Sequence, residues 1–297
     1  MPDLDTAAAE FQQIRPRLFG IAYRMLGSAH EADDVIQEAW LRWQGTDRAS
    51  IQDAPAFLST VTTRIAINAL TSARTRREAY IGPWLPEPIA TSDDDPALGA
   101  ERGEALDLAI LFLLERLTPV ERAVYVLREA FDYPFAQIAE TLEITDANAR
   151  QLAHRARSHL AEPKRTQTSR QERRRLLEAF IRAAQSGEIE QLEKLLTEDV
   201  VAYADGGGVV TASPRPVVGR ERFIRFIAGG AKFLADAEFT FIDVNGEPAV
   251  LIALEGQAPT LGVITVNAGR IETLLFQRNP EKLERLSQNA GLFGLSE

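Results

Sequence analysis

The 297-residue sequence predicts a multidomain chain that is all-α over roughly its first 160 residues and α+β over the rest. Apolar residues recur every three or four positions through the first part, which is the spacing of helices with one buried face. A proline-rich segment and a polar segment, residues 80–96 and 163–169, interrupt this pattern as linkers. Short apolar runs separated by turn residues predict strands near the end. We therefore expect helical domains at residues 1–79 and 97–162 and an α+β domain at residues 170–297.

The composition excludes several kinds of site. The chain has no cysteine, so disulfides, thiolate metal sites and thiol-based redox sensing are excluded. No apolar run approaches a membrane span and the N-terminus has no signal-peptide core, so we expect a cytoplasmic protein without a membrane partner, metal or cofactor. The net charge is −10, yet basic residues gather in Arg74–Arg77, Arg150–Arg157 and Lys164–Arg175. These clusters indicate that the chain contacts nucleic acid at a few basic patches. The alternative interpretation is that they are helix ends exposed to solvent.

Residues 133–160 have the pattern of a helix-turn-helix. Ile138, Ala139 and Leu142 form an apolar face, and Thr145 or Asp146 can cap a second helix. The inner face of that helix would carry Ala149, Leu152, Ala153 and Ala156, and its outer face Asn148, Arg150, Gln151, His154, Arg155, Ser158 and His159. The outer side chains can hydrogen-bond base edges and phosphates, as a recognition helix does. The alternative is a helical hairpin with a solvated basic face.

The first hundred residues predict three helices, at residues 11–26, 29–44 and 54–72. The outer side of the second helix would carry Asp33, Asp34, Gln37, Glu38 and Leu41. The other side of the third would carry Ser59, Thr62, Thr63, Arg64 and Asn68, followed by Arg74, Arg76 and Arg77. These small polar groups and arginines could line a path for an unpaired strand, and a neutral polar helix face is the alternative.

The linker at residues 80–96 contains the string W-L-P-E-P. Trp84 and Leu85 are costly to leave exposed, so we expect them to dock into a groove. A helix should then run from Pro96 to about Leu114, and Thr118 should precede the next helix with Pro119 in its first turn.

The C-terminal third predicts helices followed by a curved antiparallel sheet in an α+β cone. Helices are expected at residues 170–186, 189–196 and 219–234, with a strand at 200–203 between the last two. The strings FTFIDV, PAVLIAL, LGVITVN and RIETLLFQ then predict four strands, joined by turns at residues 245–246 and 267–269.

Two separated segments resemble bacterial sigma factors of the sigma-70 family. The string RPRLFGIAYRMLGSAHEADDVIQEAWLRW resembles their region 2, whose acidic helix binds the clamp helices of RNA polymerase, and AFLSTVTTRIAINALTSARTRR resembles the adjoining segment that reads the −10 element. LTPVERAVYVLREAFDYPFAQIAETL and NARQLAHRARSHL resemble region 4, which reads the −35 element. With only these two regions and no long insert between them, the chain resembles the extracytoplasmic-function (ECF) subfamily.

The resemblance implies roles for particular residues. The resemblance implies that the chain binds core polymerase at the β′ clamp helices and at the β flap. The positions that bind the clamp helices are Asp33, Asp34, Gln37, Glu38 and Leu41. The −10 set is Thr62, Thr63, Arg64, Asn68, Arg74, Arg76 and Arg77, and the −35 set is Asn148, Arg150, Gln151, His154, Arg155 and Arg157. Two departures are that Thr60 to Thr63 replace a bulky aromatic residue and that Glu143 replaces the usual glycine of the turn.

The W-L-P-E-P, D-G-G-G and N-P-E-K-L strings resemble a subgroup of these sigma factors with a SnoaL-like, NTF2-like C-terminal domain. We expect the domain to contact the linker and regulate the sigma regions without a separate anti-sigma factor, through Trp84, Leu85, Pro86, Asp205, Gly206, Gly207, Asn279, Pro280 and Lys282. All three histidines lie outside this domain, so Tyr203, Asp205, Asp243 and Glu255 are its only candidates for catalysis. We therefore predict a non-enzymatic sigma factor that binds promoter DNA. The alternatives are a conventional helix-turn-helix regulator with a small-molecule-binding C-terminal domain, and a SnoaL-type enzyme fused to a DNA-binding segment.

Overall fold

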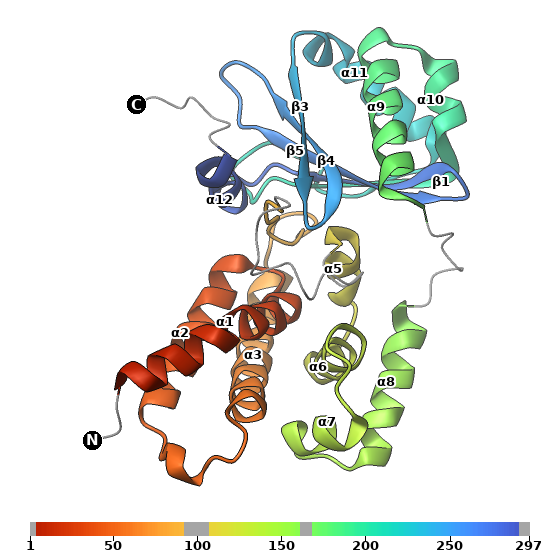
Figure 1. Ribbon diagram of the computed structural model, residues 1–297. Coiled ribbons are helices and arrows are strands. Elements are labelled where there is room, and N and C mark those ends of the chain that lie inside the picture. The colour runs from red at the N-terminus through yellow and green to blue at the C-terminus, as the bar shows by residue number, and fades with distance from the viewer. Residues whose placement is uncertain (1–3, 92–106, 161–167, 291–297) are drawn as a thin grey trace. The chain divides into compact units, whose positions relative to one another are not determined.

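A computed structural model describes residues 4–91, 107–160 and 168–290 (Figure 1). The chain divides into two compact units. Unit 1 comprises residues 1–78 and 92–161, and unit 2 comprises residues 79–91 and 162–297. Residues 79–91, which include most of the linker expected at residues 80–96, thus belong to the same unit as the C-terminal domain. We call these residues the strap.

Unit 1 begins with three packed helices, α1 (Leu4–Leu26), α2 (Ala29–Gln44) and α3 (Ala54–Glu78), with a short 3₁₀ turn at Arg48–Ser50. Helix α1 starts earlier and α3 ends later than the apolar pattern predicted. Ser28 caps α2 by accepting a hydrogen bond from the Glu31 amide at 3.2 Å. The buried Trp43 indole donates to the Ala7 carbonyl at 3.2 Å, which ties the start of α1 to the end of α2.

The second part of unit 1 contains α5 (Leu108–Leu114), α6 (Pro119–Tyr125), a π-helical turn (Val126–Ala130), α7 (Phe135–Leu142) and α8 (Asp146–Leu160). Thr118 and Glu121 form a capping box at the start of α6, with Pro119 in its first turn as expected. Most of the helix expected from Pro96 falls on residues 92–106, outside the described part of the chain.

The turn between α7 and α8 keeps its geometry without a glycine. Glu143 adopts the left-handed conformation, with φ of 55°, that ends α7. The Ile144 amide donates to the Ala139 carbonyl at 2.9 Å, and Thr145 caps α8 through the Asn148 amide at 3.2 Å. The predicted inner face of α8, Ala149, Leu152, Ala153 and Ala156, is buried. The helix-turn-helix therefore forms with a locally disfavoured residue in its turn.

Unit 2 is an α+β domain built on one six-stranded sheet in the order β2-β1-β6-β5-β4-β3. Its elements are α9 (Arg170–Ser186), α10 (Ile189–Leu195), β1 (Leu196–Asp205), β2 (Val217–Val218), α11 (Arg220–Ala235), β3 (Glu238–Val244), β4 (Glu247–Ala253), β5 (Thr260–Asn267), β6 (Arg270–Gln277) and α12 (Pro280–Ala290). The antiparallel expectation is wrong at one pair, because β1 runs parallel to β6 and the sheet is mixed. Helix α12 was not predicted from the sequence.

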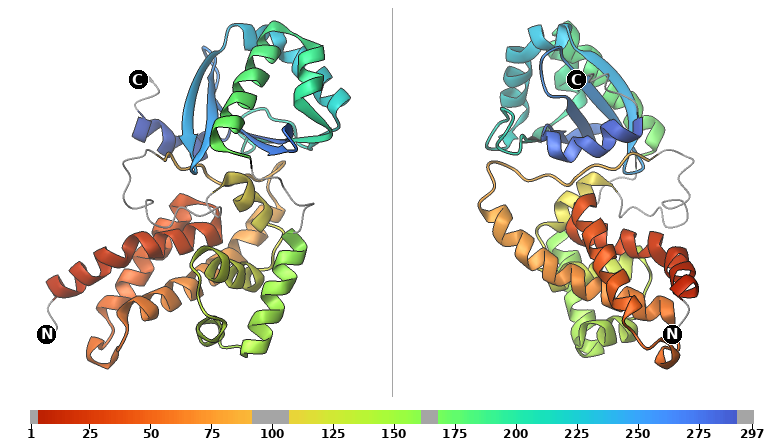
Figure 2. Two further views of the ribbon diagram at one scale, coloured as in Figure 1. Left: turned by 45° about the vertical axis from the view of Figure 1, so that its right-hand side comes forward. Right: turned by 90° about the vertical axis from the view of Figure 1, so that its left-hand side faces the viewer.

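Helices α9 and α11 pack against one face of the curved sheet and form the main core of unit 2 with it (Figure 2). Phe180 of α9 and Phe223 of α11 stack with their ring centroids 6.1 Å apart. The turn between β3 and β4 places Asn245 and Gly246 at φ of 55° and 79°, as a tight hairpin requires. One mixed sheet with helices packed on it makes this an α+β domain, so the predicted fold class is confirmed.

No helix in residues 4–91, 107–160 or 168–290 is long and apolar enough to cross a membrane. Within those same ranges, no group of histidine and acidic side chains is arranged to hold a metal ion.

Candidate functional site

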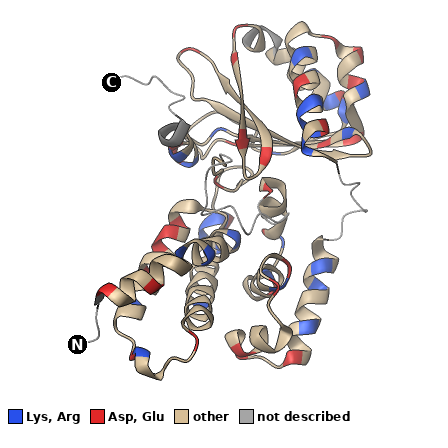
Figure 3. Cartoon of the chain, viewed as in Figure 1, with Lys and Arg blue, Asp and Glu red and all other residues tan. Residues whose placement is uncertain are grey.

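Helix α8 presents a basic face to solvent (Figure 3). Arg150, Gln151, His154, Arg155 and Arg157 are exposed, and Asn148 is partly exposed. This face is the side expected of a recognition helix, because the apolar residues of the same helix point into unit 1.

The arginines of this face are held by ion pairs at the surface. Arg150 Nε lies 2.6 Å from Asp146 Oδ1, and its guanidinium lies 4.7 Å from the centre of the Phe135 ring. Arg155 pairs with Glu121 at 3.6 Å and Arg157 with Glu129 at 2.5 Å. Exposed pairs contribute on the order of 0–1 kcal/mol each, so Arg150 and Arg157 can leave their carboxylates at little cost. Glu121, the partner of Arg155, is only 4% exposed.

Helix α2 presents the face that was expected to bind polymerase. Leu41 is 62% exposed, and Asp34, Gln37 and Glu38 also face solvent. Asp33 is partly covered and accepts a hydrogen bond from Arg15 at 3.2 Å. Between α1 and α2, a surface hollow of about 480 Å³ is lined in part by Asp33, Asp34 and Gln37. An exposed leucine beside acidic groups and a hollow is a surface that can take a protein partner.

Helix α3 differs from the expectation. Ser59, Thr62 and Thr63 were expected on its open side, and that expectation is wrong, because they are 1%, 0% and 0% exposed. The physical reason is that α3 contacts α1 and α2 and also α6 and α7, so its buried stripe is wider than the apolar pattern indicates. Thr63 donates to the Ser59 carbonyl at 2.8 Å.

The arginines of α3 are engaged within unit 1. Arg64 Nε donates to the Thr141 carbonyl at 2.8 Å, and its Nη2 lies 3.0 Å from Glu143 Oε1. Arg64 thus binds the C-terminal end of α7, where helix carbonyls lack partners. Arg74 donates to the Leu117 carbonyl at 2.5 Å, and Arg76 pairs with Glu31 of α2 at 2.5 Å. Asn68 is exposed.

A buried ionic cluster joins the end of α3 to the segment between α5 and α6. Arg77 contacts Glu115 at 2.5 Å and donates to the Leu26 carbonyl at 2.6 Å. Arg122, only 1% exposed, pairs with Glu115 and donates to the Arg24 carbonyl at 2.9 Å. Burial by itself would raise the pKa of Glu115, but the charges and hydrogen bonds of Arg122 and Arg77 outweigh it and lower that pKa.

In unit 2, the carboxylate of Asp205 is the centre of a second buried cluster. Asp205 ends β1 and is 0% exposed. It accepts hydrogen bonds from the Tyr80 hydroxyl at 2.6 Å, the Leu85 amide at 2.9 Å and the Gly207 amide at 2.9 Å. Burial and the bond to Asp205 raise the pKa of Tyr80, so this phenol stays protonated. The strap is therefore tied to the sheet through one carboxylate.

Lys282 of α12 completes the Asp205 cluster. Its Nζ lies 2.7 Å from Asp205 Oδ2 and donates to the Leu85 carbonyl at 2.7 Å. The same ammonium lies 4.1 Å from the centre of the Trp84 ring and 5.0 Å from that of Tyr80, as a cation–π contact. Leu85 is fully buried. The structure thus brings the W-L-P-E-P string together with residues 205 and 282.

The glycines after Asp205 are required by close packing. A Cβ atom on Gly206 would lie 2.1 Å from the Val210 carbonyl oxygen, and one on Gly207 would lie 2.5 Å from the Asn279 side chain. Gly207 also has φ of 66°, which a residue with a side chain rarely adopts. Asn279 is 4% exposed and donates to the Tyr80 hydroxyl at 3.0 Å. Pro280 begins α12 directly after it.

Three residues of this contact were missed by sequence reasoning: Tyr80, Asn245 and Gln277. Asn245 and Ile89 exchange two hydrogen bonds, at 2.9 and 3.0 Å, and Gln277 donates to the Pro86 carbonyl at 3.3 Å. Asn245 was recognised only as a turn residue, and Gln277 ended a predicted strand. The sequence around Asn245 and Gln277 does not indicate that their side-chain amides are buried and hydrogen-bond to backbone atoms far away in the sequence.

The four candidates for catalysis do not form a site. Asp205 is neutralised by Lys282, and Asp243 pairs with Arg170. Glu255 is an exposed residue after β4, and Tyr203 lies on β1 beside a cavity lined mainly by apolar groups. Dispersed in this way, they do not supply an acid and a base to one substrate.

Comparison with known proteins supports the sequence motifs. Residues 11–76 match the family model for sigma-70 region 2, and residues 107–160 match that for sigma-70 region 4. These ranges contain helix α2, nearly all of α3 and the helix-turn-helix. The class is thus a sigma-70 type transcription initiation factor, and sigma factors are not enzymes.

Similar proteins show to which subfamily of sigma factors the chain belongs. The ECF RNA polymerase sigma factor SigJ of Mycobacterium tuberculosis is 36% identical over 95% of this chain and 97% of its own length. A probable ECF RNA polymerase sigma factor, SigI, of the same species is 32% identical over 98% of this chain and 99% of its own length. The crystal structure of SigJ matches with a TM-score of 0.76 at 32% identity, over 94% of this chain and 98% of that one. The chain belongs to the ECF RNA polymerase sigma factors.

Proposed function

We propose that the exposed face of α8 reads the −35 element of a promoter. Arg150, Gln151, His154 and Arg155 project from the second helix of a helix-turn-helix, and arginine and glutamine can form paired hydrogen bonds with guanine and adenine. The observation that carries this proposal is that every long polar side chain of this face is exposed while the apolar face is buried.

Helix α2 would bind core polymerase. Leu41 supplies an exposed apolar contact, and Gln37 and Glu38 supply polar contacts around it. Sigma factors bind core polymerase and promoter DNA. We propose that α2 meets the β′ clamp helices and that region 4 meets the β flap, in the cytoplasm.

Reading of the −10 element would require unit 1 to open between α3 and α7. Arg64 is bonded to the end of α7, and Thr60 Oγ1 lies 3.1 Å from Thr141 Oγ1. A base flipped from the duplex could reach α3 only after these contacts part, and flipping itself costs on the order of a few kcal/mol. Arg64 would then be freed for the unpaired strand, beside Asn68, which is already exposed. Arg74, Arg76 and Arg77 would reach that strand only if their contacts with Leu117, Glu31 and Glu115 also part, and Thr62 and Thr63 only if opening uncovers them.

The strap would allow the C-terminal domain to regulate transcription within one chain. It follows α3 directly, and it is fixed to unit 2 by Asp205, Lys282 and Asn245. Holding this segment limits how far the two DNA-binding regions can separate. We propose that this restraint sets the spacing of the promoter elements that are read, and that no separate anti-sigma factor is needed.

Run-off transcription with purified core polymerase tests the promoter assignment. Changing Arg150 and Arg155 together to alanine should reduce initiation by at least about tenfold, because each base contact contributes roughly 1–3 kcal/mol. Arg222→Ala with Arg225→Ala on α11 removes the same charge from unit 2 and should leave initiation unchanged. Specific duplex binding without core polymerase, and no initiation with it, would contradict the proposal.

The same assay tests the strap. Lys282→Met removes the cation that holds Leu85 and Asp205 while keeping the length of the side chain. The proposal predicts a changed preference for the spacing between −35 and −10 elements, and Arg270→Met should not change it. Identical spacing profiles for the Lys282 variant and the native chain would contradict a regulatory strap.

A further inference from the structure

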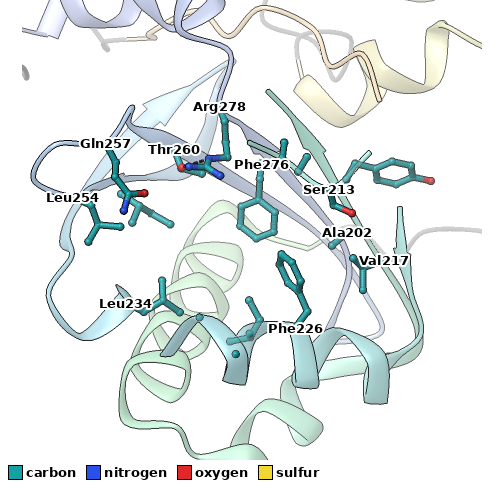
Figure 4. Close-up of a pocket in the computed structure, with 17 residues that line it drawn as sticks. Ala202, Ser213, Val217, Phe226, Leu234, Leu254, Gln257, Thr260, Phe276 and Arg278 are labelled. Atoms are coloured by element: carbon teal, nitrogen blue, oxygen red, sulfur yellow. Dashed lines mark hydrogen bonds between the residues drawn. The ribbon is translucent and has the colours of Figure 1, made fainter. Parts of the chain in front are cut away.

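Unit 2 contains a cavity that the sigma-factor function does not use. It has a volume of about 430 Å³, within the range of small-molecule sites. It lies between α11 and the concave side of the sheet, next to β1, β4 and β6 (Figure 4). The Asp205 side chain does not line it.

The body of the cavity is apolar. Phe226 and Leu234 of α11 line it on one side, and Ile252 and Phe276 of the sheet line it on the other. Phe226 and Phe276 point toward one another (Figure 4). Phe226 is 52% exposed, so a large apolar ring beside this space remains in contact with water. Covering such a ring with an apolar ligand is favourable at roughly 25 cal/mol per Å².

One end of the cavity carries a cation. Arg278 lies there beside Thr260 (Figure 4), and Gln257 and Ser213 also line the cavity. Arg278 Nε donates to Thr260 Oγ1 at 3.1 Å, and its Nη1 donates to the Thr211 carbonyl. No carboxylate in residues 4–91, 107–160 or 168–290 forms an ion pair with Arg278.

The electrostatics of Arg278 indicate an anionic partner. The side chain is partly buried, and this burial alone lowers its pKa, with no acidic neighbour to offset it. A partly desolvated guanidinium bonded only to neutral oxygens gains most from a carboxylate, which can accept two parallel hydrogen bonds. The unpaired cation and the open aromatic walls therefore favour a ligand with an anionic head and an apolar body.

We propose that this cavity binds a small carboxylic acid, with its carboxylate on Arg278 and its apolar body between Phe226 and Phe276. The ligand is an aromatic or medium-chain aliphatic acid. This site is separate from the surfaces assigned to polymerase and promoter DNA, so it can be tested without transcription.

Helix α11 offers a variant that closes the cavity. Gly230 lies on the same helical face as Phe226, Ile227 and Leu234, and a Cβ atom there would meet nothing within 4 Å. Gly230→Leu should fill the space. Leucine also stabilises a helix by roughly 0.8–1 kcal/mol relative to glycine, so this variant should fold.

Isothermal titration calorimetry on the full chain tests the proposal with 2-naphthoate and octanoate. At least one acid should bind, while acetate, which lacks an apolar body, should not. The neutral counterparts 2-naphthylmethanol and octan-1-ol should bind at least about tenfold more weakly, since a charge-assisted hydrogen bond contributes roughly 1.5–3 kcal/mol.

Three variants locate the site. Arg278→Met should reduce acid binding to the level of the neutral alcohol, Arg278→Lys should retain more of it, and Gly230→Leu should abolish it. Arg270→Met, at the opposite end of β6, should bind as the native chain does. The proposal is overturned if neither acid binds, if the alcohols bind equally well, or if the Gly230 variant binds normally.

Discussion

The contact of the strap with the rest of unit 2 and the contact of α3 with α7 each join segments far apart in the sequence, and they differ in burial. At the strap, Lys282 and Asp205 are 12% and 0% exposed and share their hydrogen bonds with Leu85, Tyr80 and Gly207. Between α3 and α7, Arg64 and Glu143 are 43% and 77% exposed. Breaking a buried pair costs about 3–5 kcal/mol, whereas an exposed pair contributes about 0–1 kcal/mol.

The difference indicates which contact can change during function. The strap is built into unit 2 and should stay closed whenever that unit is folded. In the contact of α3 with α7 the ion pair of Arg64 with Glu143 is exposed, so DNA phosphates could replace Glu143, although Thr141 of the same contact is buried. Opening for the −10 element is therefore expected within unit 1, next to a strap that remains fixed.

The largest effect is expected at Asp205. Asp205→Ala removes the buried carboxylate that pairs with Lys282 and accepts from the Tyr80 hydroxyl, and it should lower the free energy of unfolding of unit 2 by about 3–5 kcal/mol. Differential scanning calorimetry of the full chain would show this as a lower transition temperature for that unit. Asp199→Ala removes an exposed carboxylate from the same strand and should change little. If the two variants were equally stable, the contact at the strap would not be the strongly stabilising one, and it would not differ in strength from the contact of α3 with α7.

Glu115 should give a smaller, pH-dependent effect. Glu115→Gln removes the carboxylate that pairs with the buried Arg122 and Arg77, of which Arg77 also contacts Glu31 at 3.4 Å, and should cost roughly 2–3 kcal/mol near neutral pH. Because the folded pKa of Glu115 is lowered, its stabilisation is present above the unfolded value of about 4.3 and is lost as pH falls through the folded value. Denaturation across this range should show the difference between native and variant shrinking on acidification. A difference in unfolding free energy that stays constant with pH would contradict the stabilising role of ionised Glu115. Glu140→Gln, at an exposed position, is the control.

Gly207 should show a still smaller effect. Gly207→Ala imposes a left-handed alanine and a contact of 2.5 Å with Asn279. Gly256→Ala has a similar φ of 72° with nothing near its Cβ, so it measures the backbone cost alone, about 1–2 kcal/mol. The melting temperature of the Gly207 variant should fall below that of the Gly256 variant. If both fall equally, the close packing of Asn279 does not constrain the strap.

The smallest effect on stability is expected at Arg64. Arg64→Ala should lower the unfolding free energy by less than about 1 kcal/mol, because the pair is exposed. Its local effect should be visible in hydrogen exchange, where the Ile144 amide at the end of α7 should exchange faster. Asn68→Ala, one turn further along α3, should leave that amide unchanged. Unaltered exchange in the Arg64 variant would mean that this arginine does not hold α7.

The sequence predicted most of the fold because the helices of unit 1 carry apolar residues at helical spacing, and because β3 to β6 are short apolar runs separated by turn residues. It also predicted that Trp84 and Leu85 would dock, since apolar residues in a proline-rich segment need cover. The parallel pairing of β1 with β6 was missed, because strand pairing between distant segments leaves no local signal.

The sequence predicted the site residues only where a local pattern specifies them. The exposed faces of α2 and α8 followed from helical period and burial alone. The open side assigned to α3 was wrong at Thr62 and Thr63, because a helix packed on several neighbours buries small polar residues as readily as apolar ones. The roles of Tyr80, Asn245 and Gln277 depend on backbone atoms far away in the sequence, which no local pattern specifies.

Locking each contact with a disulfide tests the central claim most directly, because the chain has no cysteine of its own. Thr60→Cys with Thr141→Cys joins α3 to α7, whose hydroxyls are 3.1 Å apart. Ile81→Cys with Gly208→Cys locks the strap, since a Cβ on Gly208 would lie 3.7 Å from that of Ile81.

Run-off transcription would be measured for both variants, oxidised and reduced. The oxidised α3–α7 variant should lose initiation and regain it with reductant, while the locked strap should transcribe in both states. Initiation by the oxidised α3–α7 variant at the reduced level would contradict opening between α3 and α7.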